Sequence, residues 1–231
     1  MIAAPSGILG ERIIEPFVRV ARGKNALHEH NTTLGEFNHP DGWGAVYKEK
    51  GSFESYRSVC SCWENNDLAR LKERKIILVH TRRAPLGQVI LRNVHPFHIK
   101  HNARSWYFCH NGTIDDEAIE DHTGETDSER YFRFLLHHLD TNDPLASIKA
   151  AVNTLHDYSS LNAFLTDGDK LYVINRYTKA PRYYTLYLHQ DANGPIISSE
   201  LLLDVATDWK PLKNGQIIAY EAPAKSRTLI P

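Results

Sequence analysis

Two short polar motifs follow apolar segments that are typical of buried strands, so they lie where a strand would reach the surface of the protein. Arg82 and Arg83 follow the segment Lys75–His80. An arginine presents a planar set of N–H donors that can hold a carboxylate through two hydrogen bonds, although a solvated strand end would also account for these residues. Asn111 and Gly112 follow a second apolar segment. They suit a tight backbone turn, but a side-chain amide beside a glycine N–H also offers two donors to a developing oxyanion.

Two further motifs have less chemistry of their own. The segment 39–44, HPDGWG, predicts a tight turn that carries Trp43 into a strand. The segment 93–97, NVHPF, is typical of a loop. The chain contains no G-x-S-x-G elbow, no Walker A loop and no G-x-G-x-x-G fingerprint. We therefore expect no cofactor, and no internal Cys or Ser lies in a recognisable nucleophile motif.

The cysteines indicate neither a disulfide framework nor a metal site. There are three of them, Cys60, Cys62 and Cys109, and an odd, small number fits a reducing compartment. A zinc site at the C-x-C pair would need two more ligands, and no second Cys pair exists. Two small apolar residues that alternate along a strand are the simpler interpretation of this pair. We expect no bound metal.

Composition limits the class of protein and its partners. The 231 residues suit a single domain spanning 1–231, and the 27 Lys and Arg nearly balance the 28 Asp and Glu. This balance argues against binding to nucleic acid or to a membrane surface. No apolar run approaches the roughly 18 residues of a membrane span, and the N-terminus lacks the basic region of a signal peptide. These observations predict a cytoplasmic location.

The elements that must position these motifs follow an α+β pattern. Thr126 to Glu129 has the spacing of a helix capping box, Asp143-Pro144 is typical of a second helix start, and a third helix is expected between Gly10 and Gly23. Helices packed on antiparallel sheets explain the order of helix, strands, paired helices and strands. The clearest strands are expected at Lys75–His80, Ser105–Cys109, Lys170–Asn175, Arg182–Leu188 and Gln216–Glu221.

Taken together and in order, the motifs resemble those of a known family. HPDGWG, HTRRA, NVHPF, FCHNGTI and TDSE lie between His39 and Glu129, and an SSE segment follows at Ser198–Glu200. This series is similar to that of the class II glutamine amidotransferases, which are N-terminal-nucleophile hydrolases, and in pattern to their small stand-alone members. The resemblance implies a four-layer αββα sandwich, with two antiparallel sheets between helices, and the release of ammonia from a glutamine-like amide.

The resemblance also implies roles for four residues. Arg82 would bind the substrate α-carboxylate and Asp127 its α-amino group, which suits the one anion and one cation of a glutamine head group. The Asn111 side chain and the Gly112 N–H would form the oxyanion hole. Asp127 also lies in the first turn of an expected helix, where stabilising the helix dipole is a sufficient reason for an aspartate. Pro85 stands where relatives often have a small hydroxyl residue.

The family's nucleophile is missing from this sequence. It is a cysteine exposed at the N-terminus, whose own α-amine is the base, whereas this chain begins Met1-Ile2. Three explanations are open. The start could lie two residues late, since Cys-Arg placed before Met1 gives a typical family start. The protein could instead be a pseudo-enzyme that binds glutamine or a γ-glutamyl ligand. A substitute nucleophile such as Cys109 is the third, but on a strand it points away from His110.

The leading hypothesis is therefore an amide hydrolase or amidotransferase that acts on glutamine or a γ-glutamyl compound in its complete form. The rival hypothesis is a non-catalytic binding or scaffold module. No second domain of the synthetase kind is present to receive ammonia, so the protein is either a simple hydrolase or works with a separate ammonia-accepting partner.

Overall fold

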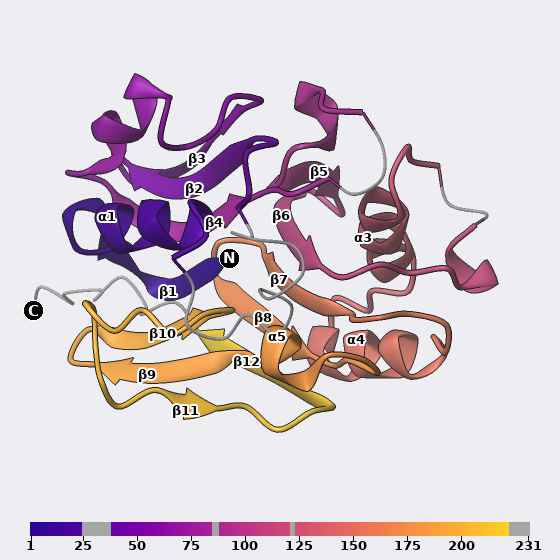
Figure 1. The fold of residues 1–231 in the computed structure, drawn as a ribbon. Helices are drawn as coiled ribbons and strands as arrows, with labels where there is room; N and C mark the ends of the chain where they lie inside the picture. Colours follow the sequence, from indigo (N-terminus) through magenta and orange to yellow (C-terminus); the bar gives the residue numbers. More distant parts are fainter. Residues whose placement is uncertain (25–37, 85–87, 121–122, 222–231) are drawn as a thin grey trace, which may run out of the picture.

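The computed structural model describes residues 1–24, 38–84, 88–120 and 123–221, and in this part of the chain it contains two antiparallel β-sheets (Figure 1). The larger sheet has the strand order β11-β9-β10-β1-β4-β2-β3, with β1 at Ile2–Leu9, β2 at Trp43–Glu49, β3 at Ser52–Ser58, β4 at Lys75–Thr81, β9 at Tyr187–Asp191, β10 at Gly194–Ser198 and β11 at Lys210–Pro211. The smaller sheet has the order β12-β8-β7-β6-β5, with β5 at Phe97–His101, β6 at Arg104–Asn111, β7 at Asn162–Thr166, β8 at Lys170–Asn175 and β12 at Gln216–Glu221.

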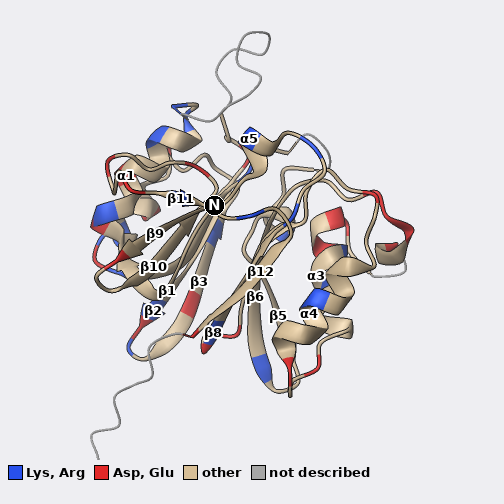
Figure 2. Ribbon diagram, turned by 90° about the horizontal axis from the view of Figure 1, so that it is seen from below, with Lys and Arg blue, Asp and Glu red and all other residues tan. Residues whose placement is uncertain are grey.

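Helices cover the outer faces of both sheets. Figure 2 shows the two sheets packed between α1 on one side and the pair α3 and α4 on the other. The chain therefore has the α+β, αββα arrangement that the family resemblance implies. The helices are α1 at Gly10–Ala21, α3 at Asp127–His137, α4 at Pro144–Asn153 and α5 at Pro181–Tyr184, with 3₁₀ turns η1 at Asn66–Leu71, η2 at Leu91–Asn93 and η3 at Glu117–Ile119.

Three apolar clusters correspond to the three interfaces between these layers. Phe17 of α1 packs against the outer face of the larger sheet. Between the sheets, Leu78 and Phe164 belong to one buried cluster. On the outer face of the smaller sheet, Phe108 stacks on Phe132 of α3, with ring centroids 4.9 Å apart. Alternate side chains of a strand point to opposite faces, so one strand such as β6 contributes to two of the clusters.

The helix starts follow the local signals in the sequence. The Thr126 side chain accepts a hydrogen bond from the Glu129 N–H at 3.1 Å, as the capping box predicts. Glu129 reaches back to the N–H of Glu125, one residue before the usual partner. The Asp143 side chain caps α4 through the Ala146 N–H at 3.1 Å. These caps fix where α3 and α4 begin.

Two local expectations are wrong. The segment expected as a strand at Arg182–Leu188 begins as the short helix α5, and β9 starts only at Tyr187. Pro181 occupies the first turn of α5, where its fixed φ favours a helix over the aromatic residues that follow. The pair Cys60 and Cys62 lies beyond the end of β3 and not along a strand, with the first residue exposed and the second buried.

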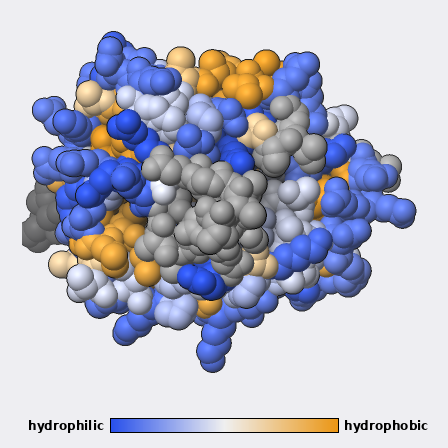
Figure 3. Space-filling model, in the orientation of Figure 1, coloured by the Kyte–Doolittle hydropathy of each residue, from blue (hydrophilic) through white to orange (hydrophobic). Residues whose placement is uncertain are grey.

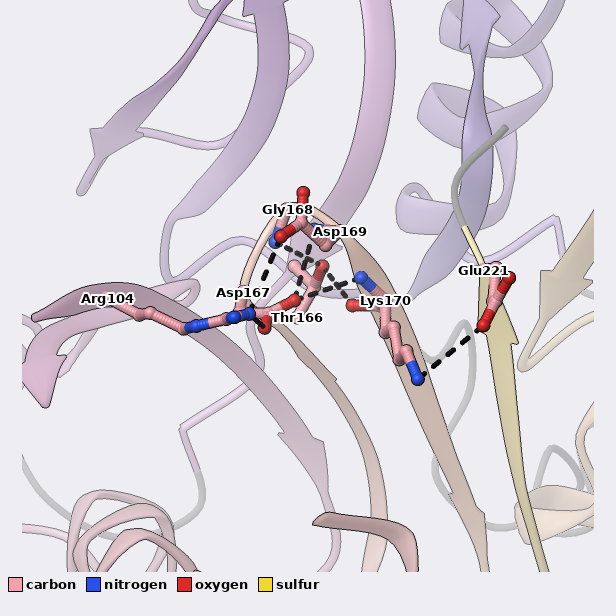
Figure 4. Close-up of polar contacts among 7 residues, drawn as sticks. All are labelled: Arg104, Thr166, Asp167, Gly168, Asp169, Lys170 and Glu221. Atoms are coloured by element: carbon pink, nitrogen blue, oxygen red, sulfur yellow. Dashed lines mark hydrogen bonds and ion pairs between the residues drawn. The ribbon is translucent and has the colours of Figure 1, made fainter. Parts of the chain in front are cut away.

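The turn between β7 and β8 of the smaller sheet depends on one buried carboxylate, that of Asp167 (Figure 4). Asp167 lies between β7 and β8, and its side chain is only 4% exposed. One of its oxygens accepts hydrogen bonds from the N–H groups of Asp169 and Lys170, at 3.0 and 2.9 Å. The other oxygen lies 2.5 Å from the Arg104 guanidinium. The carboxylate therefore closes the turn and ties it to β6.

Replacing Asp167 with alanine should lower the free energy of unfolding by about 2 kcal/mol, because the N–H donors of the turn and the arginine lose a charged acceptor. Urea denaturation of the two proteins measures the difference. Asp169→Ala is the matched control: this side chain is 81% exposed, and its removal should cost less than about 0.5 kcal/mol. Equal losses in the two variants would contradict the assignment.

Figure 3 shows apolar residues on one face of the molecule in separate patches among hydrophilic ones. Within the described ranges, none of the helices is long and apolar enough to cross a membrane.

Candidate functional site

A cavity of about 150 Å³ lies where the start of β1, the ends of β4 and β6 and the beginning of α3 meet. All four residues that the family resemblance singles out line this cavity: Arg82, Asn111, Gly112 and Asp127. They come from segments far apart in the sequence, and the two-sheet fold brings them together. The segment Ser198–Glu200, which begins at the last residue of β10, forms another part of the wall.

Arg82 is held by its backbone and is largely buried. It follows β4 directly, and its N–H donates to the Gly42 carbonyl at 2.8 Å while its own carbonyl accepts from the Asp41 N–H at 3.0 Å. The residue is only 6% exposed. Burial lowers the pKa of its guanidinium, and the carboxylates of Asp41 and Asp127 act in the opposite direction. The arginine therefore presents a partly desolvated positive charge to the cavity, which favours an anionic ligand.

Gly112 stands where no side chain fits. A Cβ atom at this position would lie 2.0 Å from the Ser160 carbonyl oxygen and 2.9 Å from Nε2 of His110. Its neighbour Asn111 is the last residue of β6 and lines the cavity. The close approach of Ser160 accounts for the glycine sterically.

Asp127 is the first residue of a helix and also lines the cavity. As the first residue of α3, it accepts a hydrogen bond from the Ser128 N–H on one oxygen, at 2.8 Å. The other oxygen accepts from the Ile114 N–H at 2.9 Å. These bonds fix the carboxylate beside the turn that carries Asn111. Each carboxylate oxygen can accept more than one hydrogen bond, so a ligand ammonium group can share it.

The beginning of the chain forms part of the same wall. The Met1 amino group donates to Oγ of Ser199 at 2.8 Å, and the Met1 carbonyl accepts from the Ser199 N–H at 3.0 Å. Burial lowers the pKa of this amine to about 6, with the acidic groups Cys109 and Glu200 acting against the shift. Sequence reasoning noted the Ser198–Glu200 segment only as a family element, and pairing with β1 explains its place in the site.

Three buried histidines line the cavity and were missed from the sequence. His80 and His95 contact each other edge to face with ring centroids 4.5 Å apart, and His110 lies one residue before Asn111. Burial lowers the pKa of all three imidazoles, so they are uncharged near neutral pH. Within the described residues, neither ring nitrogen of His95 has a hydrogen-bond partner. The sequence could have indicated these histidines as site residues, because each of them belongs to one of the motifs that resemble the family.

The HPDGWG and NVHPF motifs are in direct contact. A Cβ atom on Gly42 would meet the Val94 side chain at 2.8 Å, and one on Gly44 would meet the His95 carbonyl oxygen at 2.5 Å. Gly42 has φ of +112°, which also favours glycine. Trp43 between them is fully buried in β2, as the turn predicted. These glycines let the segment that carries His95 lie close against the larger sheet.

Cys109 has the environment of a core residue. It belongs to the cluster between the sheets, on the face of β6 opposite to His110, as the strand alternation predicts. Burial raises the pKa of its thiol. A protonated, enclosed thiol is a poor nucleophile, so the structure offers no support for Cys109 as a substitute.

The chain is similar in sequence, and in fold, to known proteins. The "Putative glutamine amidotransferase YafJ" of Escherichia coli is 29% identical over 73% of this chain and 76% of its own length. An uncharacterized protein of Methanocaldococcus jannaschii is 25% identical over 86% of this chain, and the match spans 63% of that protein. The glutamine phosphoribosylpyrophosphate amidotransferase of B. subtilis, at 15% identity, shares the fold over 95% of this chain and 46% of its own, with a TM-score of 0.68.

The last of these similarities shows that the two-sheet sandwich is the fold found in the B. subtilis amidotransferase. A family model described as class II glutamine amidotransferases matches residues 33–185, more than half of the chain. This range includes Arg82, Asn111, Gly112 and Asp127. The chain belongs to the class II glutamine amidotransferase family.

Proposed function

We propose that this protein, when a cysteine stands two residues before Met1, hydrolyses the side-chain amide of glutamine or of a γ-glutamyl compound. The observation that carries the proposal is the placement of a buried arginine, an aspartate and an Asn-Gly pair around one cavity. A γ-glutamyl head group has an α-carboxylate and an α-ammonium group, and Arg82 and Asp127 match these charges.

The remaining groups suit the chemical step. The cysteine thiolate would attack the amide carbon, and the carbonyl oxygen would become an oxyanion that accepts hydrogen bonds from the Asn111 side chain and the Gly112 N–H. Collapse of this intermediate would break the C–N bond, and the proton that the cysteine's α-amine had taken from the thiol would pass to the departing nitrogen, which leaves as ammonia when glutamine is the substrate. Water would then hydrolyse the thioester, release glutamate and restore the thiol.

The position of β1 supports this placement of the nucleophile. Met1 lines the cavity and β1 is paired on both sides, with β10 and β4. Side chains two residues apart on a strand point to the same face. If the strand continued before Met1, a cysteine two residues before Met1 would therefore share the face of Met1. That is the face on which β6, the strand that ends at Asn111, packs against the larger sheet.

The alternative is a pseudo-enzyme that binds glutamine or a γ-glutamyl ligand without cleaving it. The same charged groups would bind the ligand, and no residue would attack it. Under either function we further propose that residues 1–231 act as one cytoplasmic domain. If the protein hydrolyses glutamine, the ammonia is either released to solvent or passed to a separate partner.

The deciding experiment compares three forms: the chain as it stands, a form with Cys-Arg before Met1, and a matched form with Ser-Arg there. Ammonia or amine release from glutamine and from γ-glutamyl amides is measured for each, and glutamine binding is measured by calorimetry. Hydrolysis by the Cys-Arg form only would support the proposal. Binding by all three forms with no hydrolysis would favour the pseudo-enzyme, and neither binding nor hydrolysis would contradict both.

Mass spectrometry of the N-terminal peptide from the native host provides an independent test. A peptide that begins Cys-Arg-Met-Ile supports the cysteine mechanism. One that begins at Met1 or Ile2 rules it out for this protein.

A further inference from the structure

The imidazole of His110, the residue before Asn111, is next to the candidate oxyanion hole. It contacts two other segments, the start of α3 and the residues before β7. His110 is the penultimate residue of β6 and is 3% exposed. Its Nδ1 lies 2.8 Å from Oγ of Ser128, at the start of α3, and its Nε2 lies 3.0 Å from the carbonyl oxygen of Ser160, just before β7. Both ring nitrogens are therefore satisfied by groups from outside β6.

These partners determine where the proton is. A carbonyl oxygen can only accept a hydrogen bond, so Nε2 of His110 carries the hydrogen and donates it to Ser160. Burial lowers the pKa of the ring, partly offset by the charge of Asp127, and the ring is neutral near pH 7. Nδ1 then has a lone pair and accepts the hydrogen of the Ser128 hydroxyl. This hydroxyl has a second, longer option, Oδ1 of Asp127 at 3.4 Å.

The contacts join the two halves of the candidate site. Ser128 follows Asp127 directly, and His110 precedes Asn111 directly. The Ser160 carbonyl that accepts from the ring is the same group that leaves no space for a Cβ atom on Gly112. The imidazole thus holds the Asn111–Gly112 turn, the first turn of α3 and the segment before β7 at fixed separations.

We propose that Ser128 and His110 are positioning residues that hold the donors of Asn111 and Gly112 in place relative to the Asp127 carboxylate. The inference rests on the proposed function and adds to it two residues that act through the turn that carries Asn111 and Gly112. Asp127 keeps its own bonds to the N–H groups of Ile114 and Ser128 when the serine hydroxyl is absent. Loss of the hydroxyl therefore disturbs the oxyanion donors more than the binding of the head group.

The kinetic test uses the form with Cys-Arg before Met1. Ser128→Ala should lower kcat for glutamine hydrolysis about 10-fold or more and leave KM within about 3-fold, since outer partners that orient a catalytic group typically have effects of this size. Ser128→Thr, which keeps the hydroxyl, should recover most of kcat. Ser147→Ala, which removes a serine hydroxyl from the first turns of α4, is the matched control and should change neither constant. An unchanged kcat in Ser128→Ala, or a loss confined to KM, would overturn the proposal.

A spectroscopic test does not depend on activity. Two-bond ¹H–¹⁵N spectra of the chain as it stands, with the His110 signals identified by their absence in His110→Gln, should show a neutral ring protonated at Nε2. In Ser128→Ala the Nδ1 signal should shift, because it loses its donor. A ring protonated at Nδ1 in the parent would overturn the proposal. If the Cys-Arg form hydrolyses no amide, the proposed function fails, and these spectra decide whether the His110 arrangement exists.

Discussion

Asn111→Ala in the form with Cys-Arg before Met1 should lower kcat for glutamine hydrolysis by about 10²- to 10³-fold, the usual effect of removing one oxyanion donor from an enclosed site. Asn111 lines the cavity at the end of β6, beside a glycine whose N–H is the proposed second donor. That second donor remains in the variant, so measurable activity should persist. KM should change little, because the charged groups proposed to bind the head group are untouched. Steady-state kinetics with glutamine measure both constants.

Asn66→Ala is the matched control for this variant, since Asn66 is exposed in η1 and does not line the cavity. A second variant separates electrostatics from shape. Asn111→Asp preserves the size of the side chain but places a carboxylate beside the oxyanion, and it should be at least as inactive as the alanine variant. Parent-level kcat in Asn111→Ala would remove the oxyanion role from the proposal.

Arg82→Ala should weaken glutamine binding about 30- to 700-fold, which corresponds to about 2–4 kcal/mol for loss of a charge-assisted, two-point hydrogen bond in a partly desolvated site. The residue is 6% exposed and close enough to Asp127 for their charges to interact. Calorimetry on the chain as it stands measures the effect without catalysis. In the Cys-Arg form, the same substitution should raise KM for glutamine.

Two further variants test the origin of this effect. Arg82→Lys keeps the positive charge but not the planar pair of donors, and its binding should fall between the parent and the alanine variant. Arg70→Ala removes an arginine that is 81% exposed in η1 and should have no effect on binding. Unchanged affinity in Arg82→Ala would exclude Arg82 as the carboxylate ligand.

Local patterns in the sequence were sufficient for several elements and for the cap of a helix. The strand expected at Lys170–Asn175 is β8 with the same bounds, and that at Gln216–Glu221 is β12. Both have β-branched or aromatic residues between turn-forming Gly, Asn and Asp, so nearest neighbours define them. Thr126 caps α3 for the same reason, because the bond it makes lies within one helical turn.

Local sequence patterns could not predict the features that depend on contacts between distant segments. The strand expected at Arg182–Leu188 failed for a local reason instead, because Pro181 starts a helix just before these strand-forming aromatic residues. The burial of His80 and His95 could not be inferred from their neighbours, because their rings meet only when β4 approaches the segment before β5. The family resemblance brought Arg82, Asn111 and Asp127 into one proposal, and only the fold places them around a single cavity.

The pairing of β1 with β10 has a consequence for biosynthesis. Met1 and Ser199, which contact each other in the wall of the cavity, are 198 residues apart in the sequence. At about 5–20 residues per second, a ribosome needs on the order of 10 s or more to produce the second partner after the first. Throughout that time the edge of β1 that pairs with β10 is unpaired, and the cavity lacks the wall that Ser198–Glu200 forms. The candidate site is therefore complete only after synthesis has passed β10 and Ser199.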